Sequence, residues 1–212
     1  AKSHSVTLFT LLQSAFAYVL GRFSNEKDII MATPVAGRER EEVQSLIGCF
    51  LNTVVLRTQL PEAGDFWQFL AQNKTNVQQA FGHQDVPFDQ LVEVLQPARS
   101  LAYNPIAQVK FVLQNYKQTE FELPDLQIKP LTAMVTFVRY DLDLTVTERY
   151  RELELDWNYK SELFDASTIK RLSSSLVYLL SGLIQQKWTA SLPALVSEEV
   201  QAKLIATGTG TV

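Results

Sequence analysis

Few side chains in this sequence can act as a nucleophile, a general base or a metal ligand. The 212 residues include 2 histidines, His4 and His83, and 1 cysteine, Cys49. Cys49 and His83 could form a nucleophile and its base. However, Cys49 begins an apolar segment, where a thiol is usually inert, so we expect it to be buried. Two histidines and one cysteine are too few for a structural zinc site with Cys and His ligands. We expect no bound metal.

His83 opens the run HQDVPFD at residues 83–89, where two interpretations compete. Asp85 could orient His83 as a general base, or the run could form a hydrogen-bonded corner before a helix. Adjacent residues seldom orient one another across a ring, so the corner is favoured.

Asn52 and Thr53 are polar residues inside an otherwise apolar segment. A buried amide must find hydrogen-bond partners. Asn52 therefore either ties two stretches of backbone together or faces a cavity, and its sequence context leaves both alternatives open.

Alternating helical and strand patterns predict the elements that position these residues. Strand patterns occupy residues 28–33, 50–57, 108–114, 126–129, 141–147 and 152–159. Helical periodicity occupies residues 8–21 with Gly21 as C-cap, 66–81 after Asp65, 88–95 after Pro87, and 166–184 after Asp165. The charged run at 37–42 predicts a loop or helix start. This order predicts one α/β domain with a mixed sheet flanked by helices.

Composition narrows the classes of partner. The chain is 46% hydrophobic and has a net charge of -4. Because it has no cluster of basic residues, we expect neither nucleic acid nor an anionic membrane as a partner. No signal peptide or membrane span is evident, which predicts a cytoplasmic protein. We expect a folded unit over residues 1–192 and a linker over residues 193–212 toward a further domain.

Three segments of the sequence stand out together: residues 47–57 (IGCFLNTVVLR), residues 83–89 (HQDVPFD) and residues 99–106 (RSLAYNPI). In this order they resemble the fifth ([IV]GxFVNTxxxR), sixth (HQDxPFE) and seventh (RDxSRNPL) core motifs of nonribosomal peptide synthetase condensation domains. Weaker likenesses occur at residues 31–38 (MATPVAGR), 108–115 and 140–142. The motifs occur in the same order as in the family, although the seventh differs from the family's pattern at several positions.

The resemblance implies half of a two-lobed fold like that of chloramphenicol acetyltransferase, and the chain is similar to the C-terminal lobe. The family joins carrier-bound aminoacyl or peptidyl thioesters by an amide bond, using an HHxxxDG motif in the other lobe. This sequence has no HH pair. We therefore expect no catalytic residue here, no directly bound cofactor, and no activity of the chain alone. Implied partners are the N-terminal lobe, donor and acceptor peptidyl carrier proteins bearing 4′-phosphopantetheine, and an adjacent adenylation domain.

The resemblance also implies roles for individual residues. The expected substrate-channel residues are Asn52, Gln108, Gly48 and Thr53. The expected structural residues are Arg57, His83, Gln84, Asp85, Pro87, Phe88, Arg99, Asn104, Pro105 and Asp141. A loop near residues 34–48 would floor the channel, and a segment within 131–140 would cross to the other lobe.

Without its partner lobe, the apolar run at 134–138 is expected to promote self-association. Two other functions compete with the condensation lobe. One is a non-catalytic binding or scaffold module derived from this fold, and the other is a small acyltransferase that uses His83.

Overall fold

The computed structural model of the chain describes residues 1, 4–98, 100, 102–114, 138–149, 152–185, 192–197 and 200. The predicted strand at 126–129, the self-association run apart from residue 138, Arg99 and most of the predicted linker lie outside these residues. So does most of the predicted crossing segment.

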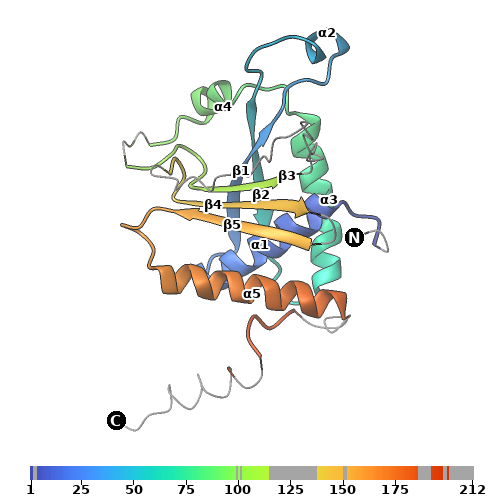
Figure 1. Cartoon of the computed structure of the whole chain (residues 1–212), viewed down its shortest axis with the longest axis vertical. Helices are drawn as coiled ribbons and strands as arrows, with labels where there is room; N and C mark the ends of the chain where they lie inside the picture. Colours follow the sequence, from blue (N-terminus) through green and yellow to red (C-terminus); the bar gives the residue numbers. More distant parts are fainter. Residues whose placement is uncertain are drawn as a thin grey trace, which may run out of the picture.

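Within the described part of the chain, five strands form one mixed sheet in the order β2-β1-β3-β4-β5 (Figure 1). The strands are β1 (Asp28–Val35), β2 (Asn52–Gln59), β3 (Val109–Gln114), β4 (Leu142–Arg149) and β5 (Glu152–Tyr159). β2 runs antiparallel to β1 and β5 antiparallel to β4, whereas β3 is parallel to both of its neighbours. The mixed sheet and the late hairpin are both confirmed.

Three long helices cover one face of this sheet: α1 (Leu8–Ser24), α3 (Phe66–Gly82) and α5 (Ala166–Ile184). α1 contacts both of the other two. Two shorter helices, α2 (Glu41–Gln44) and α4 (Phe88–Leu95), lie at the same end of the sheet but apart from one another (Figure 1). This end also carries the junction between β1 and β2.

Two of the long helices, α1 and α3, begin where a side chain satisfies the first free backbone N–H groups. The Asp65 carboxylate accepts hydrogen bonds of 2.8 Å from the amides of Trp67 and Gln68, which confirms the predicted cap of α3. Thr7 caps α1 by accepting from the amide of Thr10 at 3.0 Å. Asp165 precedes α5 as predicted but makes no side-chain cap hydrogen bond.

Large aromatic side chains dominate the core between helices and sheet. Phe16, Phe66 and Phe111 are fully buried, and the ring of Phe16 meets that of Trp157 edge to face. Along β4, Leu142, Leu144 and Val146 enter this core while the intervening residues do not, as the alternating pattern predicts. Burying one such side chain contributes about 1.5–3 kcal/mol.

The core also contains a polar cluster that joins α1, β2 and α3. Gln13, Ser14, Thr58 and Asn73 are each at most 3% exposed. The Asn73 amide donates to Gln13 Oε1 and Ser14 Oγ at 2.7 Å each, and Gln13 Nε2 donates to Thr58 Oγ1 at 3.0 Å. Thr58 Oγ1 donates in turn to Asn73 Oδ1 at 3.2 Å, closing the cluster.

Two details of the predicted helices are wrong. Gly21 does not end α1, because the helix continues to Ser24 and Asn25 adopts the left-handed conformation with φ of 58°. Gly21 instead permits a close approach, since a Cβ there would lie 2.1 Å from Leu60 Cδ1. Helical periodicity over residues 166–184 also places Ile184 on the apolar stripe of α5, but this residue is 83% exposed at the end of the helix. None of the helices in the described residues combines the length and apolar character needed to cross a membrane.

Candidate functional site

The three motif segments meet at the end of the sheet that carries α4. A hollow of about 160 Å³ lies there, and residues of all three segments line it. Its lining residues are Ala32, Thr53, Phe88, Asp89, Val92, Asn104, Pro105, Ala107, Arg139 and Tyr140. Segments that are distant in sequence therefore form one recess with both polar and apolar lining residues.

A second hollow of about 850 Å³ adjoins the first, because Asp89, Val92 and Pro105 line both. Glu93 adds a second carboxylate to this larger hollow. The described residues contain no group of three or more His, Cys, Asp or Glu side chains placed to hold a metal ion.

Asn52 is the first residue of β2 and uses its whole side chain to bind backbone. Its Nδ2 donates to the carbonyls of Gln84 and Val86, at 2.7 Å each. Its Oδ1 accepts from the amide of Phe88 at 3.1 Å, and so caps α4 from another element. Of the two alternatives open for Asn52, the structure has the one that ties two stretches of backbone. A contact with substrate stays a prediction.

The segment around His83 is a hydrogen-bonded corner. The His83 amide donates to the Ala80 carbonyl at 3.2 Å, and the Val86 amide donates to the His83 carbonyl at 3.1 Å. His83 and Asp85 are exposed, and no hydrogen bond joins their side chains in the described structure. The arrangement needed for an Asp-oriented base is therefore not formed here. The side chain of Gln84 instead contacts the loop between β1 and β2, where its Nε2 donates to Glu39 Oε1.

Gln108 and Asn104 hold the turn that leads into β3. Gln108 Nε2 donates to the Asn104 carbonyl at 3.0 Å, and Asn104 Nδ2 donates to the Arg139 carbonyl at 2.7 Å. Gln108 thus uses one of its two side-chain N–H groups within its own segment. The turn is joined in this way to the residues that lead into β4.

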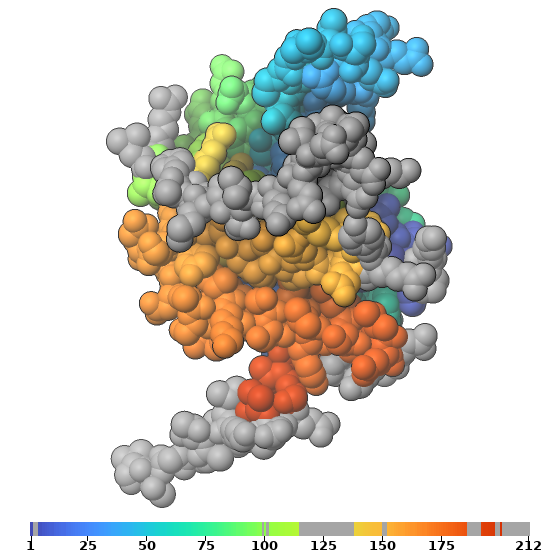
Figure 2. All heavy atoms as spheres, in the orientation of Figure 1, coloured from blue at the N-terminus to red at the C-terminus, as the bar shows by residue number. Residues whose placement is uncertain are grey.

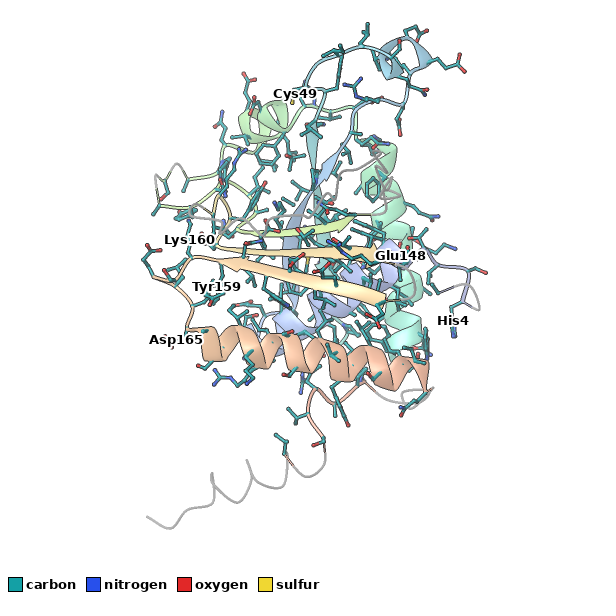
Figure 3. All side chains as sticks on the ribbon, in the orientation of Figure 1. His4, Cys49, Glu148, Tyr159, Lys160 and Asp165 are labelled. Carbon is teal, nitrogen blue, oxygen red and sulfur yellow. The ribbon has the colours of Figure 1, made fainter. Side chains whose placement is uncertain are left out.

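Asp141 stands just before β4 and forms an ion pair with Lys160 at 2.6 Å. Lys160 follows β5 (Figure 3) and also donates to the Ala102 carbonyl at 3.2 Å. One ammonium thereby joins the end of the hairpin to the seventh-motif segment. Lys160 was not expected in this position from the sequence, since a lysine after a strand carries no distinguishing signal.

Arg57, the last residue of the fifth motif, pairs with Asp28 across β1 and β2, as expected. Its NH2 lies 2.6 Å from Asp28 Oδ2, and its Nε contacts both carboxylate oxygens at 3.0 Å. Hydrogen bonding to Arg57 lowers the pKa of Asp28, against a smaller opposing effect of desolvation. The pair lies at the far end of β1 from the recess, since Asp28 begins that strand.

The loop between β1 and β2 departs most from expectation. Cys49 is exposed, so its predicted burial is wrong: β2 begins only at Asn52, and the thiol stands before the strand (Figure 3). A glycine such as Gly48 could permit a close backbone approach, but a Cβ there would meet only the Phe50 ring, at 3.3 Å. The tight contact is at Gly37 instead, where a Cβ would lie 2.0 Å from the Phe50 carbonyl oxygen.

Comparison with known proteins identifies the family to which this fold and recess belong. A family model for the condensation domain matches residues 1–205. The chain therefore belongs to the condensation-domain family.

Two curated relatives come from two species of Brevibacillus. The chain is 36% identical over 186 residues to tyrocidine synthase 3 of Brevibacillus parabrevis, covering 88% of this chain and 3% of that protein. It is 31% identical over 201 residues to gramicidin S synthase 2 of Brevibacillus brevis, covering 95% of this chain and 4% of that protein. The chain thus spans a small part of each of these relatives.

Solved structures of related proteins match most of this chain, but the chain covers only part of each of them. A four-domain nonribosomal peptide synthetase bound to AMP and glycine matches 89% of this chain with a TM-score of 0.77 and 27% identity, over 15% of its own chain. The X-domain from teicoplanin biosynthesis, solved with OxyB, matches 89% of this chain with a TM-score of 0.77 and 26% identity. The match covers 42% of that X-domain chain.

Proposed function

We propose that this chain is the C-terminal lobe of a condensation domain that forms amide bonds between carrier-bound thioesters in nonribosomal peptide synthesis. The observation that carries the proposal is the pair of coverages against the X-domain structure. A match with a TM-score of 0.77 takes in 89% of this chain but only 42% of that one. Such coverage is expected when one lobe of a two-lobed fold is compared with the whole.

In this proposal the lobe supplies one wall of a channel, and the recess beside α4 is part of that wall. Thr53, Asn104 and Arg139 offer polar groups there, and all three line the recess. Amide formation between two tethered substrates gains mainly from positioning and from stabilisation of charge in the tetrahedral state. A rigid wall contributes to both without supplying a general base.

The proposed partners follow from the same reaction. Donor and acceptor peptidyl carrier proteins would bring their substrates on 4′-phosphopantetheine arms, and the N-terminal lobe would supply the catalytic histidines. An adenylation domain would follow the linker that leaves this lobe. The chain by itself is then inactive, because it contains no HHxxxDG motif.

A chimeric domain tests the proposal. Residues 1–205 replace the corresponding part of a condensation domain of tyrocidine synthase 3, and amide formation is measured with loaded carrier proteins. The chimera should form product, and this chain alone should not. A folded but inactive chimera would contradict the proposal, provided that the parent domain is active.

A second measurement separates the proposal from the small-acyltransferase alternative. Amide formation by the isolated chain that disappears in His83→Ala would favour that alternative. If mixing the chain with a separately expressed N-terminal lobe restores amide formation, the two-lobe proposal is supported.

A further inference from the structure

Residues 37–50 project from the end of the molecule without a hydrophobic core of their own (Figure 2). β1 and β2 are paired along their full length, up to Val35 opposite Asn52, so this loop leaves and re-enters the sheet at adjacent positions. None of its residues is buried, and α2 within it is only 4 residues long. Something other than burial must therefore hold its shape.

Arg38 supplies that hold through its guanidinium group. NH1 donates to the carbonyls of Val43 at 2.6 Å and Leu46 at 2.7 Å, and NH2 donates to the carbonyl of Gly48 at 2.8 Å. One side chain thus gathers three carbonyls that lie across α2 and the turn after it. A planar fork with several donors can do this, and a single ammonium cannot do it equally well.

The Phe50 ring completes the arrangement around Arg38. The guanidinium carbon lies 4.5 Å from the centre of that ring, within the range of a cation–π contact. Gly37 has φ of 63° and allows the chain to pass against the Phe50 carbonyl. The start of the loop is therefore fixed against its end.

Two further contacts connect this loop to the candidate site. Glu39 accepts a hydrogen bond from Gln84 in the corner, and Asn52 binds the same corner from the start of β2. The corner leads into α4, which lines the recess. The position of the loop is thereby linked to the position of α4.

The sequence around Arg38 allowed two interpretations. Arg38 and Glu42 are four residues apart and could form an ion pair, but a solvated charged face without a specific contact was favoured. In the described structure, the hydrogen bonds of Arg38 go to backbone carbonyls instead. Arg40, two residues further on, is exposed, and its side chain makes no hydrogen bond or ion pair with the described residues, so it is a natural control.

We propose that Arg38 is a positioning residue that fixes residues 37–50 as the floor of the channel and supports turnover through them. This inference rests on the proposed function, because the loop can form the floor of a channel only if this chain lines one. Arg38 itself touches no reacting atom in this account. Its effect passes through the loop that it folds.

Hydrogen exchange on the 212-residue chain tests the structural half. The amides of Val43 and Leu46 donate to the carbonyls of Arg40 at 3.1 Å and Val43 at 3.3 Å, so they report on the loop. Arg38→Ala should accelerate their exchange about tenfold, while amides in the β1–β2 ladder stay unchanged. Arg40→Ala should change neither. Equal acceleration in the ladder would make Arg38 a general stabiliser, and no acceleration at Val43 and Leu46 would overturn the proposal.

Turnover of the chimeric domain tests the functional half. With saturating loaded carriers, Arg38→Ala should lower kcat about tenfold with little change in KM. Lys170→Ala, at an exposed position on α5 outside the loop, should match the unsubstituted chimera. Millimolar methylguanidinium, which restores the missing group, should recover part of kcat in Arg38→Ala only. The kcat of Arg38→Lys should fall between those of Arg38→Ala and the unsubstituted chimera. Equal turnover in the Arg38→Ala and Lys170→Ala chimeras would overturn the proposal.

Hydrogen exchange and turnover of the chimera test different parts of the proposal, so a negative result in one can be told apart from a negative result in the other. If the unsubstituted chimera forms no product, the proposed function is contradicted, and with it the role of Arg38 in turnover. The exchange of Val43 and Leu46 still decides whether Arg38 folds the loop.

Discussion

The hydroxyl of Tyr18 on α1 donates a hydrogen bond of 2.8 Å to the backbone carbonyl of Pro193, near the other end of the chain. Pro193 was expected to begin a linker. Instead it is buried, and Leu192 and Leu195 pack against the main core. The first residues after the predicted boundary are therefore attached to the folded unit, and a free linker can begin only beyond them.

Tyr18→Phe should loosen this attachment while leaving the core packing in place. Tyr18 is 2% exposed, and burial raises the pKa of its hydroxyl, so the hydrogen bond persists at neutral pH. Its loss should cost about 1 kcal/mol. For a chain of this size the melting temperature should fall by about 2–4 °C. Residues 192–197 should also be cleaved faster by a protease. Tyr103→Phe, at an exposed tyrosine, should change neither quantity, and an unchanged melting temperature in Tyr18→Phe would show that the contact does not stabilise the fold.

Asn52→Ala should destabilise the corner and α4. The substitution removes two donors from carbonyls and the cap of the Phe88 amide, and we expect a loss of about 1–3 kcal/mol. The denaturation midpoint and the exchange rate of the Phe88 amide would measure it.

Asn52→Asp provides a matched comparison, because it keeps the acceptor for Phe88 and removes both donors. Faster exchange of Phe88 in Asn52→Ala than in Asn52→Asp is expected if the cap is real. The channel role remains separately testable in the chimera. A loss of turnover per folded molecule in Asn52→Ala would support contact with substrate, whereas a loss of folded protein alone would leave Asn52 as a tie between segments.

Much of the fold could be predicted from the sequence because its signals are local. The bounds of α4 follow from Pro87 before it and Pro97 beyond it, and the β4–β5 hairpin follows from strict alternation. Asp65 as the cap of α3 is a similar local signal. In each case the residues that decide the structure are neighbours in the chain.

The site was harder to predict because its contacts join distant segments. Nothing near Asn52 indicates that its partners are the carbonyls of Gln84 and Val86. Arg38 lies in a charged run whose simplest interpretation is a solvated face, and its carbonyl partners become visible only when the loop is folded. Cys49 was misplaced because the apolar pattern extends three residues ahead of β2.

Asn73→Leu should be among the most destabilising single changes outside the aromatic core. Leucine has a similarly branched but larger side chain, and it would leave Gln13 Oε1 and Ser14 Oγ without their donor and Thr58 without its acceptor. Each buried polar group left unsatisfied costs about 1–3 kcal/mol, so we expect a total loss near 3 kcal/mol or more. Asn76→Leu, on the exposed side of the same helix, serves as the control for chemical denaturation. A double-mutant cycle with Gln13→Leu should show strong coupling, and additive effects would mean that the cluster does not act as a unit.

Arg57→Gln should lower stability in a pH-dependent way that identifies Asp28 as the partner. Because Arg57 lowers the pKa of folded Asp28 below its unfolded value of about 3.9, the pair stabilises the fold fully only above that unfolded value. The contribution is lost as the pH falls through the folded pKa, where the carboxylate becomes protonated. Urea midpoints of the unsubstituted chain and Arg57→Gln should therefore differ at pH 6 and converge toward acid pH. Both partners are partly exposed, with side-chain exposures of 64% for Arg57 and 41% for Asp28, so added salt should also reduce the difference. Asp28→Asn should remove the pH dependence of the Arg57→Gln effect. A difference in midpoint that stays constant from neutral to acid pH would mean that Arg57 stabilises the strand by packing rather than by its ion pair.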